Sequence, residues 1–232
     1  MPGAGEFDSY GETYREAVER SIAFSRTEHE FFTRAKAREL LRTAARRLGD
    51  PRRISVHDIG CGPGETDRML EGRVARLAGV DTSAAMVEAA RKRNPWAEYR
   101  IAEAGAPLPF PDGSFDLAFA ICVLHHVEPP QRPALISEAV RVTRSGGALV
   151  IFEHNPFNPL TRRAVAGCEF DRDAVLLRRG ESERLLAGAG LRDPEGAYIV
   201  FFTRDSARLQ RIERLLCRVP LGAQYVVSAL RP

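Results

Sequence analysis

Three glycines at alternate positions, Gly60, Gly62 and Gly64, form the segment whose spacing is most suggestive of chemistry. They follow the apolar run Val56–Ile59 and precede Glu65. Glycine lets the backbone approach a ligand closely, and the first turn of a following helix offers unpaired N–H groups. The segment therefore predicts a nucleotide-binding turn between a strand and a helix.

The charge and spacing of this turn indicate which nucleotide it binds. A dinucleotide-binding turn spaces its glycines G-x-G-x-x-G, so that a pyrophosphate lies at the helix N-terminus. Here the third glycine comes one residue early, and Asp58 and Glu65 add carboxylates on either side. Carboxylates repel a pyrophosphate but favour a ligand that carries an ammonium and a sulfonium group. Asp81 ends the next apolar run, where its carboxylate can accept hydrogen bonds from both ribose hydroxyls.

The segment from Asp58 to Gly64 resembles motif I of the class I S-adenosylmethionine (SAM) dependent methyltransferases, of the methyltransferase-11 kind. Two later segments, 108–116 (L-P-F-P-D-G-S-F-D) and 122–127 (C-V-L-H-H-V), resemble segments of small-molecule methyltransferases. The resemblance covers about residues 30 to 155. It implies SAM as the cofactor and an α/β fold: a Rossmann-like, doubly wound, seven-stranded sheet with an antiparallel final strand, in three αβα layers.

The resemblance also implies roles for individual residues. Asp81 would bind the ribose, and Glu103, which replaces the usual Asp, would bind the adenine amino group beside the Ala104 N–H. Met86 would lie along the adenine face, or be a core side chain. Lys36 would bind the cofactor carboxylate, or face solvent. The full set of expected cofactor-binding residues is Lys36, Asp58, Gly60, Cys61, Gly62, Gly64, Asp81, Thr82, Met86, Glu103, Ala104 and Cys122.

Histidines supply the candidate catalytic groups. His154 lies in a segment, 153–157, that looks like the N-P-P-F/Y motif of DNA and protein amide methyltransferases. In those families the motif follows the fourth strand, whereas here it follows the predicted fifth, which argues against a nucleic-acid acceptor. We predict His154 as general base and His126 as the second catalytic candidate, since a histidine titrates near neutrality. A loop histidine without chemistry is the alternative.

No third ligand is spaced to complete a metal site with the paired histidines, so no metal is expected.

Periodicity predicts an alternation of strands and helices that positions these groups beyond strand ends. Residues 1–50 are expected to form an N-terminal helical cap, including a helix capped by Thr27 and Glu30, and residues 51–232 the SAM-binding domain. Residues 204–218 predict a packed helix with a solvated basic face, or alternatively a site for an anionic substrate or a membrane surface. The expected strands are 54–59, 76–80, 99–102, 115–122, 148–152, 198–202 and 224–229, and the expected helices 27–48, 65–71, 83–94, 131–143 and 181–189.

The composition of the chain limits its domain number, its cysteine chemistry and the kinds of partner that it can bind. The 232 residues are 44% hydrophobic with a net charge of +3, which is typical of one globular domain and too little charge to argue for a polyanionic partner. No apolar run approaches the ~20 residues that span a bilayer, and the N-terminus lacks the features of a signal peptide. The four cysteines have no C-x-x-C spacing and are expected to be free thiols. We expect a cytoplasmic protein, monomeric or homodimeric, without membrane or nucleic-acid partners.

These features together predict a SAM-dependent methyltransferase that acts on a small-molecule acceptor, in specialised or cell-surface metabolism. Two alternatives stay open: a protein or peptide methyltransferase, and a non-catalytic SAM-binding module. A nucleotide-linked oxidoreductase is disfavoured by the glycine spacing and by Glu65.

Overall fold

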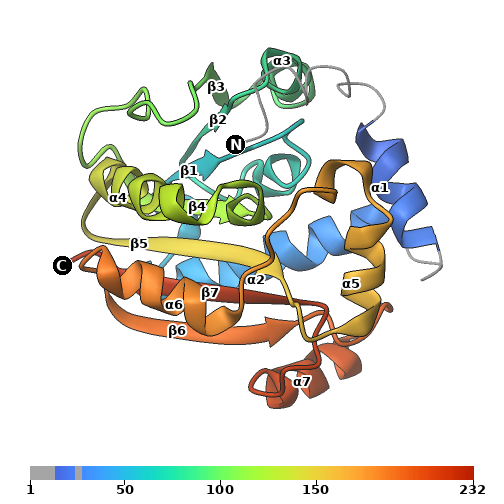
Figure 1. Cartoon of the computed structure of the whole chain (residues 1–232). Helices are drawn as coiled ribbons and strands as arrows, with labels where there is room; N and C mark the ends of the chain where they lie inside the picture. The colour runs from blue at the N-terminus through green and yellow to red at the C-terminus, as the bar shows by residue number, and fades with distance from the viewer. Residues whose placement is uncertain (1–13, 24–27) are drawn as a thin grey trace.

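The computed structural model describes residues 14–23 and 28–232. Within them a seven-stranded sheet has the order β3-β2-β1-β4-β5-β7-β6 (Figure 1). Neighbours from β1 to β5 pair in parallel, and β7 pairs antiparallel with β5 and with β6. The predicted doubly wound sheet with an antiparallel final strand is confirmed. The strands are β1 (Ser55–Ile59), β2 (Arg76–Asp81), β3 (Glu98–Ile101), β4 (Phe115–Ile121), β5 (Thr143–His154), β6 (Arg192–Ile199) and β7 (Gln224–Leu230).

Helices cover both faces of this sheet (Figure 1). One hydrophobic cluster joins α2 and α3 to one face, and a second cluster joins α4 and α6 to the other. No helix among the described residues is long and apolar enough to cross a membrane. The helices are α1 (Tyr14–Ile22), α2 (His29–Leu48), α3 (Ala84–Arg93), α4 (Arg132–Val142), α5 (Pro159–Ala166), α6 (Arg179–Gly188) and α7 (Ala207–Leu216), with 3₁₀ turns η3 (Pro51–Arg53), η4 (Asp67–Leu70), η5 (Leu124–His126), η6 (Pro129–Gln131) and η7 (Glu169–Asp171).

The central strands explain why the two faces form. Side chains alternate across a strand, so a strand covered on both sides is apolar throughout. On β4, Leu117 and Phe119 pack against the α2 face, whereas Ala118 and Ala120 pack against the α4 face. The chain winds outward from β1 to β3 and then crosses back to β4. The order reverses between β1 and β4, which is where an open α/β sheet binds its ligand.

The early helix packs as its sequence predicts. Ala37, Leu40, Leu41 and Ala44 of α2 are buried in the core beside the sheet. Thr27, its expected cap, lies outside the described residues, and the side chain of Glu28 makes no capping hydrogen bond. The helix α2 therefore packs in the core of the sheet and not as a separate cap. Of the two helices described within residues 1–50, α1 is the one that lies outside that core. The division of the chain at residue 50 stays a prediction.

Several elements differ from the sequence-based expectations, among them β5, which begins at Thr143 instead of residue 148. The strand expected at 198–202 runs instead from Arg192 to Ile199, because its polar first half is an exposed edge and Val200, with φ of 61°, ends it. The helix expected at 65–71 is only the 3₁₀ turn η4. The helix expected within 204–218 forms as α7, but none of its residues is buried and Leu215 is 83% exposed. The expected packing of α7 is therefore wrong within the described part of the chain.

Candidate active site

Beyond the carboxyl ends of the central strands, the described residues enclose a cavity of about 650 Å³. The ends of β1, β2, β4 and β5 all reach it, and α1 and α5 contribute to its wall. The predicted site residues that line it are Lys36, Gly60, Gly62, Asp81, Thr82, Met86, Glu103, Cys122, His126 and His154. Four others, Asp58, Cys61, Gly64 and Ala104, do not line it. The structure thus brings most of the predicted residues to one space.

The glycine turn is shaped by close contacts on one side and open space on the other. A Cβ at Gly60 would come within 2.5 Å of Val123 Cγ2, so only glycine fits there. A Cβ at Gly62 would meet no atom within 4 Å, and Gly62 has φ of +51°. Gly62 lines the cavity. The backbone is therefore exposed to whatever the cavity holds, as a close-approach turn requires.

Asp81 links this turn to the next helix. Its Oδ2 accepts a hydrogen bond from Gly62 N at 2.8 Å, and its Oδ1 accepts one from Ser83 N at 2.9 Å. Ser83 in turn caps α3, because its hydroxyl accepts from Met86 N at 3.2 Å. Asp81 therefore holds the turn in place and presents its carboxylate to the cavity.

Asp58 lies beneath the glycine turn instead of in the cavity wall. It is 3% exposed, and burial together with the carboxylates of Asp67 and Asp81 raises its pKa well above the ordinary value. Burial raises the pKa of Asp67 to about 6. Tyr99 donates to Asp67 Oδ2 at 2.7 Å, and Asp58 Oδ1 has no hydrogen-bond partner among the described residues.

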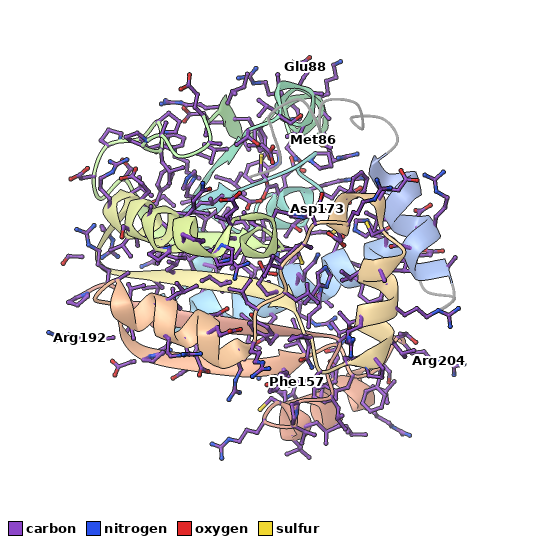
Figure 2. The ribbon with its side chains drawn as sticks, in the orientation of Figure 1. Met86, Glu88, Phe157, Asp173, Arg192 and Arg204 are labelled. Atoms are coloured by element: carbon purple, nitrogen blue, oxygen red, sulfur yellow. The ribbon has the colours of Figure 1, made fainter. Side chains whose placement is uncertain are left out.

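The residues predicted to bind adenine, Met86 and Glu103, and those predicted to lie near the methionyl part, Lys36 and Cys122, come from different elements of the cavity wall. Met86 points inward from α3 and is 2% exposed, whereas Glu88 points outward (Figure 2). Glu103 is exposed at the cavity edge. Lys36 is 8% exposed and has no hydrogen bond or ion pair with any described residue. Cys122, at the end of β4, has φ of 57°, which is unusual for a residue with a side chain.

These observations fit the cofactor that the sequence resemblance implies. Open space faces Gly62, the Asp81 carboxylate lines the cavity, and the buried Lys36 lines it too without an ion pair to any described residue. A nucleoside with a charged amino-acid tail needs these groups: a backbone platform, a ribose acceptor and a cation for its carboxylate.

A cluster of histidines and carboxylates forms the opposite wall of the cavity. His125 Nδ1 lies 2.5 Å from Glu153 Oε2, and Leu124 N donates to Glu153 Oε1 at 2.7 Å. On its other side, His125 Nε2 lies 3.3 Å from Asp171 Oδ1. His126 Nε2 lies 3.4 Å from the same oxygen. The rings of His125 and His154 are 5.1 Å apart between centroids.

The three imidazoles have different pKa shifts. Burial disfavours the charged form of His125, but Glu153 and Asp171 outweigh it and hold its pKa well above the ordinary value. Burial lowers the pKa of His126 to about 4, and the charge of His125 adds to the shift. Burial and the same charge lower the pKa of His154 to about 4.

Sequence reasoning missed His125, Glu153 and Asp171 as members of this wall. Asp171 belongs to η7, which follows α5, and neither element was expected from the sequence. A local signal for α5 existed: Asn158 accepts from Leu160 N and Thr161 N, and Pro159 follows at the first helical position. No comparable signal marks Asp171. All four cysteines are free thiols, as predicted.

Comparison with known proteins finds methyltransferases. A family model described as a methyltransferase domain matches residues 57–151. Trans-aconitate 2-methyltransferase of Paracidovorax citrulli is 38% identical over 125 residues, which cover 52% of this chain and 47% of that protein. The 27-O-demethylrifamycin SV methyltransferase of Amycolatopsis mediterranei is 34% identical over 166 residues, which cover 64% and 58%. The chain spans about half the length of these curated relatives.

A solved structure extends the likeness over the fold. A SAM-dependent methyltransferase from Thermotoga maritima superposes with a TM-score of 0.64 at 22% identity, covering 86% of this chain and 91% of that one. At this identity the likeness concerns the fold alone. Taken with the family match and the curated relatives, it makes this chain similar to SAM-dependent methyltransferases over residues 57–151 and in its fold.

Proposed function

We propose that this protein transfers a methyl group from SAM to a small organic acceptor. One observation carries the proposal: a single cavity joins the glycine turn and Asp81 to the histidine wall. Transfer from a sulfonium is an in-line displacement, so a cofactor and an acceptor must share one enclosed space. The relatives described above are named for small-molecule acceptors, which supports the same class here.

Residues of this chain would hold each part of the cofactor. Asp81 would bind the ribose hydroxyls, and Met86 and Glu103 the adenine. Lys36 would bind the carboxylate, and the backbone at Gly62 would lie against the methionyl part. When bound, SAM supplies an electrophilic methyl group on a positively charged sulfur.

The acceptor half of the cavity combines an apolar wall with the histidines. Apolar side chains from α5 and from the loops beside it line this half, including Leu160, Val165, Phe170 and Phe201. An acceptor with an apolar body could bury it here and direct a polar nucleophile to His126 and His154. These two imidazoles are the proposed proton acceptors for a hydroxyl or ammonium nucleophile. A concave site of this size, with α1 and α5 in its wall, favours a small molecule over a folded macromolecule.

Methyl-labelled SAM tests the proposal. We would incubate the purified protein with it and with separated low-molecular-weight, protein and RNA fractions of its source cells, while S-adenosylhomocysteine release is followed by mass spectrometry. Label should enter the low-molecular-weight fraction in step with S-adenosylhomocysteine, and the Asp81→Ala variant should lose this transfer. Label in the protein or RNA fraction, or in none, would contradict the proposal. The cytoplasmic location, the oligomeric state and the metabolic setting stay predictions.

A further inference from the structure

We infer that His125, His154 and Asp171 form a binding site for a divalent transition-metal ion in the acceptor half of the cavity. They come from η5 after β4, from the end of β5 and from η7 after α5. One ligand atom from each, an imidazole nitrogen or a carboxylate oxygen, lies within 4.8 Å of the other two. This inference departs from the sequence-based expectation of no metal, because the other two donors, His154 and Asp171, are distant from His125 in the sequence and only the fold brings them together.

The distance between His125 and Asp171 suits two ligands of one ion better than a direct hydrogen bond. His125 Nε2 and Asp171 Oδ1 are 3.3 Å apart. A charge-assisted N–H···O bond is usually about 2.7 to 2.9 Å long. Two ligands that each lie about 2.1 Å from an ion at the tetrahedral angle are about 3.4 Å apart. The two atoms therefore already have the spacing of a coordinated pair.

Glu153 has the role of the carboxylate that supports a metal-binding histidine. It lies 2.5 Å from Nδ1 of His125 and is 1% exposed, and its other oxygen accepts from Leu124 N. A carboxylate on one ring nitrogen keeps the proton there and leaves the lone pair of the other nitrogen for an ion. The free nitrogen of His125 is the one that faces Asp171.

Charge balance within the cluster also favours a divalent cation. Glu153 and Asp171 bring two negative charges to a wall where their side chains are 1% and 12% exposed. One divalent ion balances both. Buried charges need compensation of this kind, because the interior solvates them poorly.

The donor set indicates the class of ion. Two imidazoles and one carboxylate suit Zn²⁺, Fe²⁺, Co²⁺ or Ni²⁺, whereas Mg²⁺ and Ca²⁺ prefer oxygen ligands throughout. His125, His154 and Asp171 all line the cavity, so the remaining coordination positions face the space for the acceptor. An oxygen of the acceptor, from a hydroxyl or a carboxylate, could occupy one of them. In that state His154 is a ligand, and His126 is the proposed proton acceptor.

Metal titration of the chelator-treated protein tests the site without SAM or any acceptor, so its result is independent of the proposed methyl transfer. Co²⁺ is followed by its visible absorption and Zn²⁺ by calorimetry. We expect one ion per chain, with Zn²⁺ displacing Co²⁺. The variants Asp171→Asn and His154→Gln should abolish this stoichiometric binding, and Glu153→Gln should weaken it about 10- to 100-fold.

A matched control is His29→Gln. His29 lines the same cavity, but its Nδ1 lies 2.9 Å from Glu65 Oε2 and it is not a member of the cluster. Its metal binding should equal that of the unaltered protein, and circular dichroism and thermal melts would establish that each variant is folded. Absence of stoichiometric binding in the unaltered protein, or binding unchanged in folded Asp171→Asn and His154→Gln, would overturn the inference.

Discussion

Replacing Asp81 by alanine should separate cofactor binding from stability. The two oxygens of this carboxylate accept backbone N–H groups from Gly62 and Ser83, and the carboxylate lines the cavity where a ribose hydroxyl would lie. A hydrogen bond to a charged group contributes about 1.5 to 3 kcal/mol. Loss of the ribose contacts should therefore raise the Kd for S-adenosylhomocysteine about 10- to 150-fold. Calorimetric titration of both proteins measures this change.

A second carboxylate provides the control for this experiment. Asp116 also accepts from a backbone N–H, that of Ser55 at 2.7 Å, and it binds Arg144, but it does not line the cavity. Asp116→Ala should lower the melting temperature as Asp81→Ala does, because both lose hydrogen bonds to the backbone. Its affinity for S-adenosylhomocysteine should stay unchanged. If Asp81→Ala binds as tightly as the unaltered protein, or if both variants lose affinity equally, Asp81 does not bind the ribose.

Three further predictions concern the glycine turn, stability at low pH and the histidine wall. Gly62→Ala should lower the free energy of unfolding by about 1 to 2 kcal/mol, because the backbone at this position is left-handed. Gly60→Ala should lower it further, because its Cβ would lie 2.5 Å from Val123. Equal melting temperatures of the two variants would contradict this close contact with Val123. Burial lowers the pKa of His57 to about 4 from an ordinary value of 6.5. As the pH falls below 6.5, the unfolded chain binds a proton at this position before the folded protein does. The free energy of unfolding should therefore fall by about 3 kcal/mol between pH 6.5 and 4. His57→Phe, which keeps the ring stacked on Phe115, should flatten that part of the denaturation profile, and an unchanged slope would argue against the shift. His154→Ala should lower turnover with little change in S-adenosylhomocysteine affinity, and an unchanged rate with the true acceptor would remove His154 from the catalytic groups.

The cofactor half could be predicted from the sequence because strict local requirements create it. A strand buried on both faces must be almost entirely apolar, as 115–121 is apart from Asp116, and a turn that meets Val123 closely must be glycine at position 60. Asp81 was predictable because strand ends at a switch point face one another. These constraints act within a few residues and leave a pattern in the chain.

The acceptor half could not be predicted in the same way. Asp171 approaches His125 through a loop and a 3₁₀ turn, which carry no hydrophobic period. Glu153 adjoins His154 in sequence, but its pairing with His125 depends on the register of β4 against β5. The edge strand β6 begins earlier than the sequence predicts, because its exposed first half is polar and is held by pairing with β7. Tertiary contacts, and not local preference, determine these features.

A crystal structure with S-adenosylhomocysteine bound would test the proposed cofactor site. The ribose oxygens should lie within hydrogen-bond distance of the Asp81 carboxylate, the cofactor carboxylate at Lys36, and the sulfur should face the wall that contains His126 and His154. Binding of the nucleoside elsewhere, or density for a diphosphate-bearing nucleotide against the Gly60–Gly64 turn, would contradict it.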